Sequence, residues 1–179
     1  LRPGLVVVGE ASPDFADYED ELHRLVAERG LTGSVTFLPG QDRADFARTM
    51  RHAAIVLVPS HSETFGLVAL EASASGVPVV AAAAGGLTEA ICNTHTGLLV
   101  PSHDPQAWAD VIASLLRDPQ RRADLGATGR QRAEEMSWAR VAERTLAAYR
   151  RAVSACCVHR VAFLHAHPDD ETLASGALI

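Results

Sequence analysis

Lysine is absent from this chain, because all sixteen of its basic side chains are arginine. Any chemistry that requires a lysine ammonium therefore needs residues beyond this sequence. Cysteine is scarce, since Cys92, Cys156 and Cys157 are an odd number with no spacing typical of a metal site. The neighbours Cys156 and Cys157 cannot form a relaxed disulfide with each other. We expect reduced thiols and a cytoplasmic protein.

Long apolar runs and a positive net charge are also missing. No stretch approaches the length that spans a membrane, and no signal peptide is visible at the start. The formal net charge of −6 argues against nucleic acid as the main partner, since duplex-binding proteins usually carry a basic face. A hydrophobic content of 47% and a charged content of 21% are typical of a soluble globular protein.

Short apolar segments alternate with helical patterns up to residue 101. This alternation predicts an α/β fold with a parallel sheet and right-handed crossovers. Beyond residue 101 the apolar residues recur at helical spacing only, which predicts C-terminal helices, and Gly126 and Gly129 are expected to weaken one of them. The expected strands lie at residues 5–8, 35–38, 55–58, 77–81 and 97–100. The expected helix caps are Asp42, Asp104 and Ser137.

The segment at residues 60–71 is the most informative part of the sequence. It leads from the strand expected at 55–58 into a helix of small residues that ends near Gly76, so Glu63 lies in a strand-to-helix turn. Open α/β sheets bind ligands at such turns, and free N–H groups at a helix start favour an anion. These N–H groups belong to Thr64, Phe65, Gly66 and Leu67. Glu71 would lie about 12 Å from Glu63 if every step between them were helical.

These groups together fit a polyhydroxylated ligand with a diphosphate at its centre. Each carboxylate would accept hydrogen bonds from one end of the ligand, while the diphosphate faces the helix start. The alternative is a solvated helix face with a favourable charge near its N-terminus, which is the usual role of two such glutamates.

Further motifs surround the two glutamates in a fixed order. They are Gly76-Val77-Pro78-Val79-Val80, Ala84-Gly85-Gly86-Leu87-Thr88-Glu89 and Thr96-Gly97-Leu98-Leu99-Val100-Pro101. With the Glu-x7-Glu segment, their order and spacing resemble the C-terminal half of retaining glycosyltransferases of family 4, which have the two-domain GT-B architecture. The resemblance covers roughly residues 5–152. It implies a Rossmann-like doubly wound parallel sheet followed by C-terminal helices.

By this resemblance, Glu63 is the catalytic candidate, which contacts hydroxyl groups of the donor sugar and orients it for transfer with retention. Glu71 holds the ribose of the nucleotide, and the amides at residues 64–67 hold a sugar hydroxyl and phosphate oxygens. Gly85 and Gly86 let the backbone approach the ligand, although glycines in turns more often serve only the geometry. No cofactor is implied for the transfer, and no nucleophile is assigned.

The resemblance also indicates what lies outside this sequence. The family holds the donor diphosphate with an arginine and a lysine from a loop that would precede Leu1, and it binds the acceptor in an N-terminal domain. Because the chain opens without an initiator methionine, we expect an excerpt that binds a donor without turnover of its own. Similarity to the glycosyltransferases of mycothiol biosynthesis implies UDP-N-acetylglucosamine as donor and inositol phosphate as acceptor.

A second motif, His165-Ala166-His167-Pro168-Asp169-Asp170-Glu171, lies near the end of the chain. It follows an apolar segment at residues 160–164 that predicts a strand. His167 and Asp170 carry side chains that suit zinc, and Asp169 between them is suited to act as a general base on a metal-bound water. The alternative is an ordinary helix start, in which proline and acidic residues are common.

This motif is similar to the opening strand, loop and helix of the LmbE-like (PIG-L) zinc N-acetylglucosaminyl deacetylases. The resemblance implies zinc ligands at His167 and Asp170 and a general base at Asp169. The family's third ligand is a histidine far downstream, beyond Ile179. We therefore expect zinc to bind only if the full deacetylase domain is present.

The two resemblances divide the chain into two predicted domains. Residues 1–153 are expected to form the donor-binding domain, truncated at its start, and residues 158–179 an extra β-α fragment too short to fold alone. A fused enzyme that catalyses two consecutive steps explains both resemblances. The alternative explanation is an artefactual junction of two neighbouring genes. Two other functions remain open, a metal-dependent deacetylase fusion and a non-catalytic module that binds a nucleotide or a partner protein.

Overall fold

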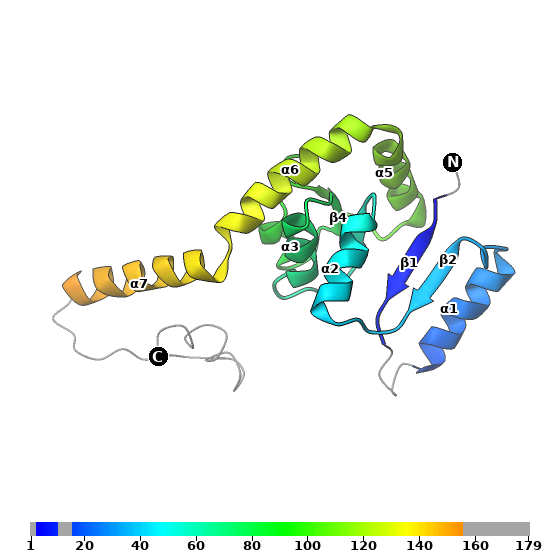
Figure 1. Ribbon diagram of the computed structural model, residues 1–179, viewed down its shortest axis with the longest axis horizontal. Coiled ribbons are helices and arrows are strands. Elements are labelled where there is room, and N and C mark those ends of the chain that lie inside the picture. The colour runs from blue at the N-terminus through cyan, green and yellow to red at the C-terminus, as the bar shows by residue number, and fades with distance from the viewer. Residues whose placement is uncertain (1–2, 11–15, 156–179) are drawn as a thin grey trace. The chain divides into compact units, whose positions relative to one another are not determined.

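The computed structural model describes residues 3–10 and 16–155, and strands alternate with helices up to β5 (Figure 1). Only helices follow β5 in the described residues, as the sequence predicts. The elements are β1 (Leu5–Val8), α1 (Ala16–Glu28), β2 (Val35–Leu38), α2 (Arg43–His52), β3 (Val56–Val58), α3 (Leu67–Ala74), β4 (Val79–Ala82), α4 (Leu87–Ala90), β5 (Leu98–Val100), α5 (Pro105–Arg117), α6 (Pro119–Glu135) and α7 (Trp138–Ala155). A search of the described residues finds no helix long and apolar enough to cross a membrane.

Each pairing between the described strands is parallel, which confirms the α/β fold class. The strands hydrogen-bond as two sheets, with the orders β1-β2 and β3-β4-β5. The chain correspondingly divides into two compact units, one ending at Ala53 and the other beginning at Ala54. The predicted fragment at residues 158–179, including the strand expected at 160–164, lies outside the described residues.

The first unit consists of the β1-β2 sheet with α1 and α2. The two strands pair over their full length. The His23 ring of α1 lies against the Phe37 ring of β2, with 4.1 Å between the ring centres. Asp42 caps α2 by accepting the N–H of Asp45 at 2.8 Å, which confirms the predicted cap.

The core of the second unit is built around β4, the central strand of its sheet. All four residues of β4 are buried, and Val79, Val80 and Ala81 have no exposed surface. A central strand of a parallel sheet is covered on both faces, which explains this unbroken apolar run. Leu87 and Leu115 are likewise fully buried and anchor α4 and α5 in this core.

Helix α6 packs against α3 through glycines that the sequence predicts only to weaken a helix (Figure 1). A Cβ atom added to Gly126 would lie 2.3 Å from the carbonyl oxygen of Gly76, at the end of α3. One added to Gly129 would lie 3.0 Å from the carbonyl oxygen of Thr96. The glycines therefore permit a close approach of backbones, which offsets their poor helix propensity.

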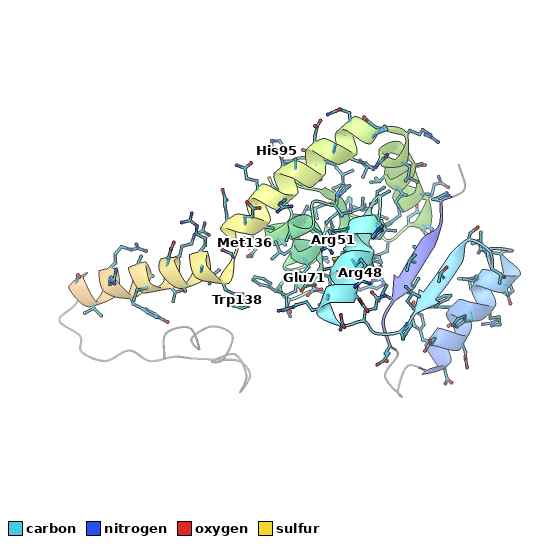
Figure 2. All side chains as sticks on the ribbon, in the orientation of Figure 1. Arg48, Arg51, Glu71, His95, Met136 and Trp138 are labelled. Atoms are coloured by element: carbon cyan, nitrogen blue, oxygen red, sulfur yellow. The ribbon has the colours of Figure 1, made fainter. Side chains whose placement is uncertain are left out.

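The predicted caps of the C-terminal helices differ in outcome. Asp104 caps α5, its carboxylate accepting the N–H of Gln106 at 3.3 Å. The Ser137 side chain makes no hydrogen bond within the described residues, and only its carbonyl accepts, from the N–H of Val141. The predicted side-chain cap at Ser137 is therefore wrong, because the backbone alone begins α7. The first residue of this helix, Trp138, is 62% exposed (Figure 2).

Candidate functional site

Three loops gather at the carboxyl edge of the β3-β4-β5 sheet. Because the strands are parallel, the loops at residues 59–66, 83–86 and 101–104 all leave the sheet at the same edge. The outer strands β3 and β5 lie about 10 Å apart, twice the usual strand spacing. The sequence-predicted residues at 63–67, 85 and 86 lie in these loops or at the start of α3, so the structure brings them together.

The turn that carries Glu63 is fixed by two hydrogen bonds. The Glu63 carbonyl accepts the N–H of Gly86 at 2.8 Å. The Glu63 carboxylate accepts the N–H of Phe65 through Oε1 at 3.4 Å, a long bond within its own turn. Glu63 is half-buried and has no ion pair among the described residues, so its carboxylate retains acceptor capacity for a ligand.

Gly85 and Gly86 pack directly against the backbone of this turn. A Cβ atom at Gly85 would lie 2.1 Å from the carbonyl oxygen of Glu63, and one at Gly86 would lie 2.4 Å from that of Thr64. Gly85 also has a φ of +46°, in the left-handed region that favours glycine. These contacts support a positioning role for both glycines, through the turn that they hold in place.

The start of α3 leaves backbone donors without acceptors. Gly66 is the N-cap residue with a φ of +85°, and it offers no side chain to cap the helix. Within the described residues, no acceptor is found for the N–H groups of Gly66, Leu67 and Val68. The φ of +85° favours glycine at this position, and a Cβ atom there would also lie 3.1 Å from the Leu87 side chain, which would have to shift slightly. Of the predicted donors, Gly66 and Leu67 thus lie at a helix start of the kind that binds anions, whereas the N–H of Phe65 is not free as expected, because it donates to the Glu63 carboxylate.

Glu71 lies on the exposed face of α3, one turn after Leu67 (Figure 2). Its carboxylate makes no ion pair or hydrogen bond within the described residues. The sequence estimate of its distance from Glu63 assumed a helical path between them. That assumption is wrong, because α3 begins at Leu67 and residues 63–66 form a turn instead.

His61 and His103 form a contact that sequence analysis does not predict. Their rings stack, with 3.9 Å between centres and 28° between planes. Each is the third residue after its strand, β3 and β5 respectively, so the two loops meet at the edge where β4 also ends. Both histidines thus occupy the same position after parallel strands of one sheet. This pattern in the sequence could have predicted that they lie close together.

The predicted zinc residues cannot be compared with this site. His167, Asp169 and Asp170 lie outside the described residues. Among the residues that the structure does describe, no group of three or more His, Cys, Asp or Glu side chains is placed to hold a metal ion. The zinc site therefore stays a prediction.

A comparison with protein families identifies the domain that contains this sheet edge and both glutamates. The profile of the glycosyl transferases group 1 family matches residues 3–132. The chain belongs to this glycosyltransferase family. The match includes the turn at residues 63–67, Glu71 and the glycine pair, and it ends before the motif at 165–171.

Curated relatives of this group 1 domain share a name. A D-inositol 3-phosphate glycosyltransferase of Stackebrandtia nassauensis is 47% identical over 158 residues, covering 86% of this chain and 36% of the relative. One of Kineococcus radiotolerans is 45% identical over 160 residues, covering 85% and 37%. The chain thus spans little more than a third of the length of these relatives.

Solved structures of other proteins share the fold. Anabaena Alr3699/HepE in complex with UDP-glucose superposes with a TM-score of 0.70 at 33% identity, covering 74% of this chain and 36% of that one. Its complex with UDP alone gives the same TM-score at 32% identity, with the same coverage. Sucrose-phosphate synthase from Thermosynechococcus elongatus gives 0.75 at 37% identity, covering 85% and 39%.

Proposed function

We propose that the carboxyl edge of the β3-β4-β5 sheet binds the nucleotide-activated sugar of a retaining glycosyltransferase. One observation carries the proposal. Within the part of the chain that the structure describes, the N–H groups of Gly66, Leu67 and Val68 lack acceptors, and Glu63 and Glu71, which lie on either side of this helix start in the sequence, have no ion pairs. A diphosphate is the ligand part that suits such donors, and hydroxyl-bearing sugars suit the carboxylates.

The roles follow from the positions of the residues along the turn and helix. Glu63 accepts hydrogen bonds from hydroxyls of the donor sugar, and Glu71 accepts them from the ribose. The N–H groups of Gly66 and Leu67 face the diphosphate and stabilise the charge that builds on it as the glycosidic bond to the leaving group breaks. Gly85 and Gly86 hold the Glu63 turn in position.

The proposed donor is UDP-N-acetylglucosamine and the proposed acceptor is inositol phosphate. The acceptor is supported by the name that the curated relatives share, and the uridine by the UDP and UDP-glucose complexes of a structural neighbour. Because the chain spans 36% of the Stackebrandtia relative, we propose that it supplies donor binding and that turnover needs the remaining two thirds. The absence of lysine fits this division, since a lysine on the diphosphate would come from elsewhere.

Titration of the chain with UDP tests the proposal. We expect saturable binding that the Glu71→Gln variant weakens by about tenfold, the scale of one lost charge-assisted hydrogen bond. Glu135→Gln is a matched control, because Glu135 is exposed on α6 and has no recorded partner among the described residues. An affinity for UDP that Glu71→Gln leaves unchanged would contradict the assignment of the ribose site.

A second proposed function, zinc-dependent deacetylation, rests on the sequence motif alone. His167 and Asp170 would hold the zinc ion and Asp169 would accept a proton from a water molecule; an imidazole and a carboxylate fit the donor set of catalytic zinc, which polarises water. The test is the zinc content of a protein extended past Ile179. One zinc per chain that His167→Ala removes supports this function, and a zinc-free extended protein contradicts it.

A further inference from the structure

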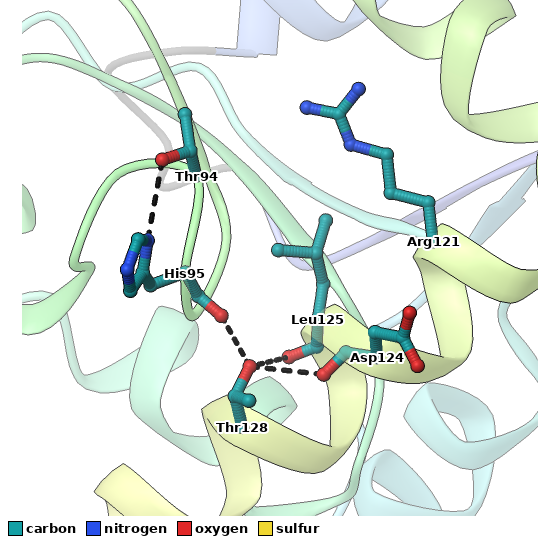
Figure 3. A pocket seen from close by; sticks show the side chains of 6 residues that line it. All are labelled: Thr94, His95, Arg121, Asp124, Leu125 and Thr128. Carbon is teal, nitrogen blue, oxygen red and sulfur yellow. Dashed lines mark hydrogen bonds between the residues drawn. The ribbon is translucent and has the colours of Figure 1, made fainter.

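A hollow lies at the opposite edge of the same sheet from the proposed donor site. It is formed between the loop that precedes β5 and the first turns of α6, and its volume is about 350 Å³. Because the strands are parallel, a loop before β5 lies at the amino edge, away from the carboxyl edge that carries the Glu63 turn. The lining residues are Thr94, His95, Arg121, Asp124, Leu125 and Thr128 (Figure 3).

A hydrogen bond connects the two walls of this hollow, the loop before β5 and helix α6. The Thr128 hydroxyl of α6 donates a hydrogen bond to the carbonyl oxygen of His95 in the loop (Figure 3). Thr94 has a φ of +67°, a conformation that β-branched residues rarely adopt, and its N–H donates to the Gly97 carbonyl at 2.8 Å. The loop is therefore held in one shape before any ligand arrives, and a preformed shape lowers the entropy cost of binding.

The charged groups at the hollow differ in their partners. Asp124 accepts a hydrogen bond from the Gln120 side-chain amide at 2.9 Å. The Arg121 guanidinium has no ion pair and no hydrogen bond within the described residues. The His95 ring lies 3.4 Å from the Thr94 hydroxyl through Nδ1 (Figure 3), and its Nε2 has no partner recorded among those residues. The Arg121 guanidinium, unpaired within the described residues, is thus the group that favours an anion at this hollow, while the Asp124 carboxylate keeps acceptor capacity of its own.

The chemistry of the lining narrows the class of anion. A guanidinium fork binds the oxygens of phosphates and carboxylates in a bidentate manner. The His95 imidazole beside it offers one further N–H donor, for which a phosphate monoester has a third terminal oxygen that a carboxylate lacks. Leu125 lies between Arg121 and the loop (Figure 3) but is only 3% exposed, whereas the volume of about 350 Å³ leaves room for an organic part beside the phosphate.

We propose that the hollow between the Thr94–His95 loop and α6 binds a small organic phosphate, with Arg121 binding two phosphate oxygens and His95 donating to the third. This site is separate from the donor site, and it holds whether or not the carboxyl edge binds a nucleotide sugar.

The test is a titration of the isotope-labelled chain, followed by the NMR shifts of backbone amides. The probes are inorganic phosphate, phenyl phosphate and acetate. We expect saturable shifts at Thr94, Thr128 and Leu125, with phenyl phosphate binding most tightly because its ring fills space in the hollow that inorganic phosphate leaves open. Arg121→Gln is expected to weaken both phosphates by about tenfold or more, the scale of a lost charge-assisted pair.

Arg117→Gln is the matched control, because Arg117 is an exposed arginine of α5 outside the lining and has no recorded partner in the described residues. It should leave the affinity for phenyl phosphate unchanged, and saturating UDP should leave it unchanged as well. The proposal is overturned if no probe saturates, if acetate binds as tightly as phosphate, or if Arg121→Gln has no effect. Shifts confined to Gly66 and Leu67 would also overturn it, since the anion would then occupy the start of α3.

Discussion

The N–H of Gly86 donates a hydrogen bond of 2.8 Å to the carbonyl oxygen of Glu63. This bond joins the turn after β4 to the turn after β3, at the edge of the sheet where we place the donor site. The two turns touch so closely that the turn after β4 cannot carry a side chain at the contact, since a Cβ atom at Gly86 would also lie 2.6 Å from the Cα atom of Phe65. The position of the Glu63 carboxylate therefore depends on a residue that itself has no side chain.

Substitution of Gly86 by alanine tests this dependence. The added methyl group must displace the turn at residues 63–65, so Gly86→Ala should lower both the melting temperature and the affinity for UDP-N-acetylglucosamine, with a stability cost of about 1–3 kcal/mol. Thermal denaturation and calorimetric titration measure the two effects. Gly33→Ala is the control, because a Cβ atom there meets nothing within 4 Å. Unchanged stability and affinity in Gly86→Ala would show that the contact is not required.

The packing of α6 on α3 predicts that Gly126→Ala affects stability in the opposite way to that expected from helix propensity. Gly126→Ala should destabilise the protein although alanine is the better helix former, because its Cβ atom would lie 2.3 Å from the Gly76 carbonyl oxygen. Ala127→Gly, at the exposed neighbouring position, should cost about 1 kcal/mol through helix propensity alone. Chemical denaturation compares the two. If Gly126→Ala raises stability, propensity outweighs packing and the close approach is not needed.

Asp118 lies between α5 and α6, and its replacement tests how much its cap contributes to stability. Its carboxylate accepts the N–H of Arg121 at 2.9 Å at the start of α6, while its own N–H donates to the Leu115 carbonyl at the end of α5. Asp118→Ala should cost about 1 kcal/mol and lower the melting temperature by about 2–4 °C. Asp110→Ala removes an equal charge from within α5, where the carboxylate accepts only from the exposed Gln106 side chain, and should cost much less. Equal losses of stability for Asp118→Ala and Asp110→Ala would contradict the capping role of Asp118.

The sequence predicts the elements and the turn that carries Glu63 well, because both depend on local patterns. Glu63 was placed in a strand-to-helix turn by the apolar run before it and the small residues after it, and the structure places it there. The caps at Asp42 and Asp104 were likewise predicted from residue type and position. Each of these features is decided within a few residues of the chain.

Contacts between residues far apart in the sequence were not predicted. The start of α3 at Leu67 depends on Gly66, whose packing against Leu87 cannot be read from the turn itself. The stacking of His61 on His103 depends on β3 and β5 lying on either side of β4. The division of the strands into two sheets likewise depends on pairing between distant segments, for which residue patterns carry no local signal.

The central claim is that Glu63 and Glu71 bind opposite ends of one nucleotide sugar. The most direct test is to titrate UDP and UDP-N-acetylglucosamine into the Glu63→Gln and Glu71→Gln variants. The account predicts that Glu71→Gln weakens both ligands by a similar factor, whereas Glu63→Gln weakens UDP-N-acetylglucosamine and leaves the affinity for UDP nearly unchanged. If Glu63→Gln weakens both ligands equally, or if neither variant changes either affinity, the claim is wrong.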